Sequence, residues 1–165
     1  MTATTIKEDR AQRSALGTME TIHAAWLAVQ WLEPYLGHGY GRGRNGNDLN
    51  DEARTILREC GWDGNDRFLD EVKDAIQDRM VEMALDLTVK GEQRSDGWEV
   101  TGAEILLSTG GPAVRIECRD AYAYGTLADP VLQCQDWFTP WTDVETSRDD
   151  DDALLWFISL FYVEG

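Results

Sequence analysis

The amino-acid sequence predicts an α+β fold, with N-terminal helices, a short antiparallel sheet around residues 98–137 and a C-terminal packing helix. Three successive patterns of spacing lead to this prediction. Apolar residues recur every three or four positions up to about residue 89, every second position from Trp98, and at helical spacing again after residue 150. The chain has 165 residues, of which 42% are apolar, and this suffices for one hydrophobic core. We expect a single domain over residues 15–165, preceded by a flexible polar N-terminus over residues 1–14.

Two helices are predicted in the first 60 residues. The first begins after Gly17 and ends between Pro34 and Gly37, because its apolar residues keep helical spacing up to that point. Glycine dominates residues 37–46, which we predict to be a loop. A short second helix is expected from about residue 51 to residue 60.

A third helix is predicted from Asn65 or Asp66, either of which can cap it, to about Val89. Its inward face is expected to be apolar and to consist of Phe68, Leu69, Val72, Ile76, Met80, Met83 and Leu87. The same segment holds six carboxylates at a constant spacing of four residues: Asp66, Asp70, Asp74, Asp78, Glu82 and Asp86. We call these six residues the carboxylate row.

The carboxylate row has two interpretations. On a helix its neighbouring members stand about 6 Å apart along the axis, and each like-charged pair costs an isolated helix roughly 0.2–0.5 kcal/mol. Duplex DNA carries about one negative charge per 1.7 Å of its axis, so the row is a candidate mimic of phosphates. It is also what the solvated face of an ordinary helix looks like, with Lys73 and Arg79 partly relieving the repulsion.

The sheet is predicted from alternating aliphatic residues. Those at 100–107 and 114–116 flank the turn sequence of residues 109–112, which indicates a hairpin. A further strand is expected over residues 131–137, and the last helix from about Asp150 to Tyr162.

The net charge restricts the kinds of partner. Thirty-one acidic against fifteen basic residues give a formal charge of -16, which disfavours direct binding to nucleic acid or to anionic membranes and favours basic partners. The second half is the more negative, with fourteen acidic and three basic residues after position 94. A second group of acidic residues lies there: Asp143, Glu145, Asp149, Asp150, Asp151 and Asp152. We predict that this group and the carboxylate row together bind the partner. Asp149–Asp152 have a structural interpretation as well, because acids at the start of the last helix cap its N–H groups and favour its macrodipole.

One aromatic segment lies close to the second acidic group. Residues 135–142 contain Trp137, Phe138 and Trp141 in an irregular pattern, and we expect this segment to present a ring at the surface. An aromatic ring beside carboxylates is a suitable anchor for an arginine of the partner.

The sequence offers no motif for a cofactor, a metal ion or catalysis. The glycine pattern from Gly41 to Gly46 has the form of a dinucleotide-binding motif, but it follows a predicted helix instead of a strand. Neither His23 nor His38 has an acid or a cysteine at metal-ligand spacing. The three cysteines show no close pairing, which indicates a reducing cytoplasm, and the longest apolar run is about half the length of a membrane span.

In its size, its charge and its two acidic groups, the chain resembles the small acidic inhibitors that phages and other mobile elements carry. These include anti-CRISPR and anti-restriction proteins, several of which are DNA mimics. The resemblance implies a cytoplasmic protein without catalytic residues that occupies the basic nucleic-acid channel of a host defence complex.

Two other functions are compatible with the sequence. An immunity protein that neutralises a cationic nuclease toxin would have the same electrostatics, and an enzyme could assemble its site from residues distant in sequence. Formation of a homodimer is also left open.

Overall fold

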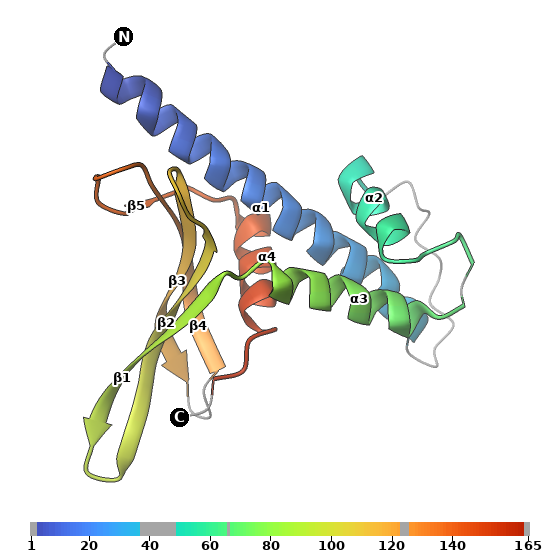
Figure 1. Cartoon of the computed structure of the whole chain (residues 1–165). Coiled ribbons are helices and arrows are strands. Elements are labelled where there is room, and N and C mark those ends of the chain that lie inside the picture. The colour runs from blue at the N-terminus through green and yellow to red at the C-terminus, as the bar shows by residue number, and fades with distance from the viewer. Residues whose placement is uncertain (1–2, 37–48, 66, 123–125, 164–165) are drawn as a thin grey trace.

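The computed structural model describes residues 3–36, 49–65, 67–122 and 126–163, and it confirms the α+β prediction (Figure 1). Three helices come first, a five-stranded sheet follows, and a fourth helix packs at the end. The elements are α1 (Ala3–Leu36), α2 (Asp51–Glu59), α3 (Leu69–Glu82), β1 (Asp86–Arg94), β2 (Gly97–Ser108), β3 (Ala113–Tyr122), β4 (Thr126–Gln135), β5 (Thr142–Asp143) and α4 (Arg148–Ile158). None of the helices in the described residues combines the length and the apolar character that a bilayer crossing requires.

The sheet is an antiparallel meander with the strand order β1-β2-β3-β4-β5. Ile105 pairs with Ile116, and Ile116 pairs with Leu132, so three fully buried side chains line up across the middle of the inner face. Most of the residues that alternate with them carry charge or amide groups on the outer face, namely Glu104, Arg115, Glu117 and Gln133. This alternation is what a sheet covered on one side requires.

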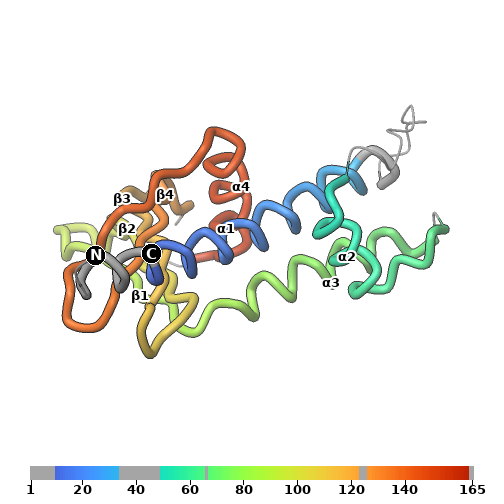
Figure 2. The backbone as a smooth tube through the Cα atoms, turned by 90° about the horizontal axis from the view of Figure 1, so that it is seen from above, coloured from blue at the N-terminus to red at the C-terminus, as the bar shows by residue number. Residues whose placement is uncertain are grey.

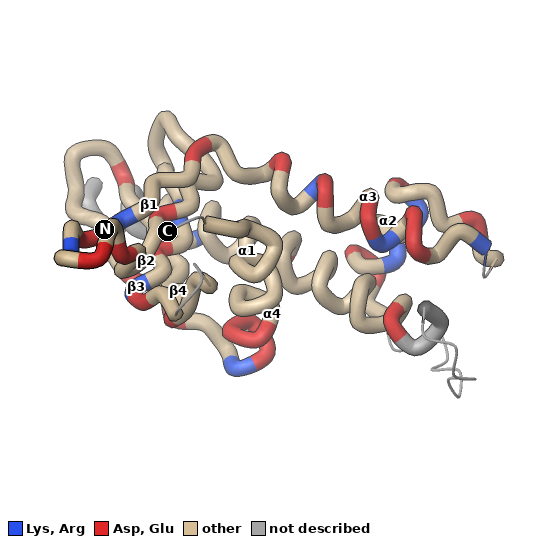
Figure 3. Tube along the Cα trace, turned by 90° about the horizontal axis from the view of Figure 1, so that it is seen from below, with Lys and Arg blue, Asp and Glu red and all other residues tan. Residues whose placement is uncertain are grey.

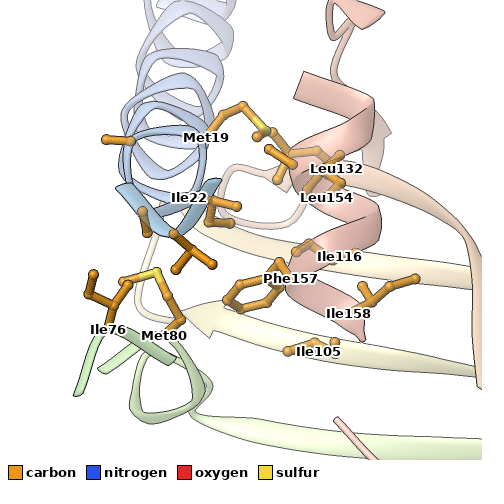
Figure 4. Packing of buried hydrophobic residues seen from close by; sticks show 14 of the residues in the cluster. Met19, Ile22, Ile76, Met80, Ile105, Ile116, Leu132, Leu154, Phe157 and Ile158 are labelled. Carbon is orange, nitrogen blue, oxygen red and sulfur yellow. The ribbon is translucent and has the colours of Figure 1, made fainter. Parts of the chain in front are cut away.

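The helices cover the inner face of the sheet and then extend beyond it. Helix α1 contacts β3 and β4, and α4 packs on β4 beside α1. Figure 4 shows Phe157 of α4 among side chains of the sheet and of the other helices, including Met80 and Ile105. Seen from above, α2 and the N-terminal part of α3 lie beside the C-terminal half of α1, away from the sheet (Figure 2).

Helix α1 is longer than the sequence indicated. It begins at Ala3, so residues 3–14, which we expected to be flexible, are helical. Ala11 and Ala15 are 3% and 0% exposed and continue the buried stripe of Met19 toward the N-terminus. Two alanines among polar residues give only a weak apolar signal, yet they pack closely once the helix lies on a folded core.

Helix α3 is shorter than predicted, because it begins at Leu69 and ends at Glu82 and not near Val89. Phe68, which we expected on its inward face, is the N-cap residue and is 69% exposed. The helix tightens over its last residues, and the N–H of Leu85 donates to the carbonyl of Leu106 in β2 at 2.7 Å. Asp86 then opens strand β1, where it pairs with Leu106. The apolar residues among 83–89 fit helical and strand spacing equally well, and pairing with β2 makes this segment a strand.

The remaining elements differ only at their ends. Helix α2 and the β2–β3 hairpin are confirmed, and β4 starts five residues before the predicted strand. Helix α4 begins at Arg148 and ends at Ile158, short of the expected Tyr162. The glycine motif of residues 41–46 and His38 lie outside the described residues, and all three cysteines are free thiols.

Candidate partner-binding surface

Four members of the carboxylate row form one exposed series on α3. Asp70, Asp74, Asp78 and Glu82 are all exposed, because Leu69, Val72, Ile76 and Met80 hold the opposite side of the helix in the core. Acidic residues follow one another along α3 in Figure 3, interrupted by a basic position. Two predicted members are absent from the series, since Asp86 belongs to strand β1 and Asp66 lies outside the described residues. The prediction of six carboxylates on one helix is therefore wrong for Asp86.

The remaining row has a simple geometry. Asp70 and Glu82 are separated by twelve residues, which is about 18 Å along a helix axis. Residues four apart are rotated by about 40° around the axis, so the row winds by about 120° from its first to its last member. The four charges thus follow a right-handed path over the solvent side of α3.

The two basic residues of α3 are paired elsewhere. Lys73 Nζ lies 3.7 Å from a carboxylate oxygen of Glu33 on α1, and Arg79 Nη1 lies 2.5 Å from Glu59 Oε2 at the end of α2. Within the described part of the chain, none of the four carboxylates on α3 has an ion-pair partner. Our expectation that Lys73 and Arg79 relieve the row is therefore not met at ion-pair distance.

An acidic groove adjoins α3, and sequence reasoning missed it. A depression of about 350 Å³ lies between α1, α2 and α3, and four carboxylates and one arginine line it together with small residues. The charged members are Glu20, Asp51, Glu52, Glu59 and Arg79. Glu20 is thirty-one residues from Asp51, so no local pattern could join them. The groove extends the negative surface of α3 onto its neighbours.

The members of the second acidic group differ in their contacts. Ser147 and Asp150 form a capping box, in which each side chain accepts from the other's backbone N–H. Asp151 accepts a hydrogen bond from Thr146 at 2.6 Å. Asp149, Asp151 and Asp152 are exposed, and carboxylates in a first turn also stabilise the helix through its macrodipole. The start of α4 is therefore an acidic helix end with a structural reason for its charge.

Asp150 also contacts His23, the histidine that an enzyme hypothesis would use. His23 Nδ1 lies 3.2 Å from Asp150 Oδ1, with both side chains about one quarter exposed at 27% and 23%. The hydroxyl of Ser147 binds the other oxygen of the same carboxylate at 2.7 Å. In a serine hydrolase the histidine must contact the serine, whereas here Asp150 stands between them. The arrangement caps a helix and joins α4 to α1.

Asp143, which we predicted to bind a partner, is paired with an arginine within the protein. Arg119 Nη2 donates to both of its oxygens at 2.8 and 2.9 Å, and the side-chain amide of Gln133 donates at 2.7 Å. These bonds from Gln133 and Arg119 lower the pKa of the Asp143 carboxyl. Its neighbour Glu145 is exposed.

Asp143 belongs to a ladder of charges that crosses the outer face of the sheet. Lys90 bridges Glu104 and Glu117, which face each other on adjacent strands, at 2.7 and 3.1 Å. Hydrogen bonds from Lys90 and Arg119 hold the pKa of Glu117 below its ordinary value. This face is therefore internally balanced, unlike α3.

The structure does not join the two acidic groups into one surface. Figures 2 and 3 place α3 on one side of α1 and α4 on the other. A partner that lies flat against α3 therefore does not reach Asp149–Asp152 on the same face. Of the predicted partner-binding residues, those on α3 lie along one exposed face, and those of the second group lie on separate elements.

Comparisons with known proteins add no assignment. No protein-family model, no curated protein and no solved structure matches the chain. Among the described residues, no group of three or more His, Cys, Asp and Glu side chains is arranged to hold a metal ion. What the surface can do must be argued from its charge and shape.

Proposed function

We propose that this chain is a cytoplasmic acidic binding protein that inhibits a nucleic-acid-handling defence complex of a bacterial host, of the anti-CRISPR or anti-restriction kind. It acts by placing α3 in the basic channel where the phosphates of a nucleic acid otherwise lie. The observation that carries this proposal is the row Asp70, Asp74, Asp78 and Glu82, exposed on one helix and without ion-pair partners among the described residues.

The charge density of α3 suits this role. One strand of DNA carries about five phosphates over about 18 Å of axis, and α3 presents four carboxylates over the same length. A channel of lysines and arginines that accommodates phosphates would meet almost as many charges on α3. The nearby groove with Glu20, Asp51 and Glu52 adds further negative charge on the same arm of the molecule.

The cost of the row also supports a functional reason for it. Asp70 to Glu82 contains three like-charged pairs at a spacing of four residues, each worth roughly 0.2–0.5 kcal/mol of repulsion. Lys73 and Arg79 do not offset this cost by pairing with the row, since each binds a carboxylate on a neighbouring helix. A binding surface for a cationic partner gives a reason to retain repulsion that a purely structural helix face lacks.

The test begins with capture of the partner. The wild-type protein, immobilised at low salt, is exposed to a bacterial host lysate, and bound proteins are eluted with a salt step and identified by mass spectrometry. Binding to the purified partner is then measured for two variants with the same change in net charge. One is Asp70→Asn/Asp74→Asn/Asp78→Asn, and the control is Asp149→Asn/Asp151→Asn/Asp152→Asn.

We expect the α3 variant to bind about 3- to 100-fold more weakly, since each exposed charge pair contributes roughly 0.2–1 kcal/mol, and the α4 control to stay within about twofold of the wild type. The wild-type protein should also displace nucleic acid from the captured complex. Equal losses in both variants, or a partner that binds no nucleic acid, would refute the proposal. Capture of a cationic nuclease toxin would assign the immunity function instead.

A further inference from the structure

The loop between β4 and β5 presents a completely exposed aromatic ring. Phe138 is 100% exposed and has a φ of 63°, a left-handed conformation that is unfavourable for a residue with a Cβ atom. Such strain at an exposed position is a reason to look for a function. Trp137 beside it is 56% exposed, and the two ring centroids lie 6.1 Å apart.

Hydrogen bonds hold this loop in shape. The Asp136 carboxylate accepts from the backbone N–H of Trp137 at 2.8 Å, and the Asp136 carbonyl accepts from both the N–H and the hydroxyl of Thr139 at 3.1 and 2.9 Å. The side-chain amide of Gln135 donates to the carbonyl of Thr139 at 2.6 Å. The ring of Phe138 is thus displayed by an ordered turn.

The neighbouring turn supports the loop from the other side. The indole of Trp137 lies so close to Gly111 that a Cβ atom added there would be 1.9 Å from its Nε1. Gly111 therefore leaves room for the indole, which in turn lies next to Phe138. The two rings form a fixed aromatic surface.

The same loop already binds one guanidinium group. Arg115 Cζ lies 4.3 Å above the ring centre of Trp141, while its Nη1 pairs with Glu104 at 2.7 Å. Aromatic rings attract cations through the negative face of the ring. Trp141 is occupied in this way, whereas Phe138, at full exposure, has no cation over its ring in the described part of the chain.

A groove of about 310 Å³ lies at the base of the same loop. Residues of the loop line it together with the N-terminal part of α1, among them Gln12, Asp136 and Thr139. Its volume lies at the lower end of the range for ligand pockets, which suits one long side chain. Asp143 at the same groove is paired with Arg119, but Asp136 has no ion-pair partner among the described residues.

We propose that Phe138 is an anchor for an arginine of the basic partner, whose guanidinium stacks on the ring while Asp136, two residues earlier in the same loop, supplies the negative charge. The basic character of the partner rests on the proposed function. Arginine is favoured over lysine, because its planar guanidinium stacks on an aromatic face and is more weakly hydrated. In Figure 1 this loop lies beside β5 at one end of the sheet, whereas α3 extends away from the sheet, so the anchor is a contact distinct from the carboxylates of α3.

The experiment compares an oligo-arginine peptide with an oligo-lysine peptide of equal length, both titrated into the full-length protein at low salt. We expect the wild type to bind the arginine peptide more tightly, and Phe138→Ala to lower the arginine-to-lysine affinity ratio by about two- to fivefold. NMR should show the indole of Trp137 and the amide of Phe138 shifting with the arginine peptide.

Tyr162→Ala is the control. Tyr162 is also an exposed aromatic residue, at 74%, but it follows α4 and belongs neither to this loop nor to α3. The affinity ratio should be unchanged in this variant. Asp70→Asn/Asp74→Asn/Asp78→Asn should weaken binding of both peptides by the same factor, because it removes charge without touching the ring.

The outcomes separate the two proposals. If Phe138→Ala leaves the affinity ratio unchanged while the α3 variant weakens both peptides, the arginine anchor is refuted and the proposed function survives. If neither peptide binds the wild type at low salt, both are refuted. If the arginine-to-lysine affinity ratio falls only in Phe138→Ala, the role of Phe138 as an arginine anchor is supported.

Discussion

Replacing Asp74 and Asp78 by Asn should make the protein more stable, although both residues belong to the proposed binding surface. The two substitutions remove all three like-charged pairs between Asp70 and Glu82 and leave Asp70 in the first turn, where it favours the helix dipole. At roughly 0.2–0.5 kcal/mol per pair, the free energy of unfolding should rise by about 0.6–1.5 kcal/mol. For a chain of this length that is a rise in the melting temperature of about 1–6 °C, at about 2–4 °C per kcal/mol.

The control carries the same change in net charge at a different place. Asp149→Asn/Asp151→Asn removes two carboxylates from the first turn of α4, where each contributes about 0.3–1 kcal/mol through the macrodipole. Relief of the repulsion between Asp149 and Asp152 offsets a small part of this loss. We therefore expect this variant to be less stable than the wild type, so the two variants differ in sign.

Urea unfolding followed by circular dichroism measures both effects. At about 0.01 M salt the Debye length is about 30 Å and the repulsion is felt in full, whereas at about 1 M it falls to about 3 Å, shorter than the spacing of the row. The increase in the free energy of unfolding of Asp74→Asn/Asp78→Asn should therefore be smaller at high salt than at low salt. If Asp74→Asn/Asp78→Asn has no gain at low salt, or if its gain persists unchanged at high salt, the row is not under repulsion and the reasoning from its cost is wrong.

Three further predictions concern the body of the fold. The pKa of Asp143 is lowered in the folded state, so its carboxylate stabilises the fold above its ordinary pKa of about 4, and this stabilisation is lost as the pH falls through the folded pKa. Asp143→Asn should therefore make the urea midpoint less dependent on pH between about 5 and 2. An unchanged pH dependence would contradict the pairing with Arg119. Gly111→Ala should destabilise the protein by at least about 1 kcal/mol and shift the indole NMR signal of Trp137. The new Cβ atom would meet that ring, and a φ of 73° is unfavourable for alanine. A variant with native stability and an unshifted signal would show that the indole does not lie beside Gly111. Phe157→Ala removes a side chain that is 0% exposed and should lower the free energy of unfolding, measured by calorimetry, by about 3–5 kcal/mol. A decrease below about 1 kcal/mol would contradict the central position of Phe157 in the core.

Most of the fold could be predicted because local periodicity agrees with the final packing. The hairpin of β2 and β3 alternates clearly, and Ile105, Ile116 and the strand containing Leu132 all face the core. The predicted secondary structure was wrong where the apolar residues fitted helical and strand spacing equally well. Leu87 and Val89 match helical and strand spacing alike, and only the pairing with β2 decides between them.

The candidate site was predictable in part for the same reason. The row on α3 follows from a spacing of four residues, which any helix converts into one path along its surface. The acidic groove with Glu20 and Asp51 could not be found in this way, because it depends on the packing of α1 against α2.

The sequence by itself determined the amount of charge, the α+β class and the exposed carboxylates of α3, since these depend on composition and on local periodicity. Only the tertiary structure decided which charges are available to a partner. It paired Asp143 with Arg119, bound Asp150 to Ser147 and His23, and directed Lys73 and Arg79 to neighbouring helices. The physical reason is that ion pairs form between groups that lie close in space, and closeness across the chain is set by how helices and strands pack.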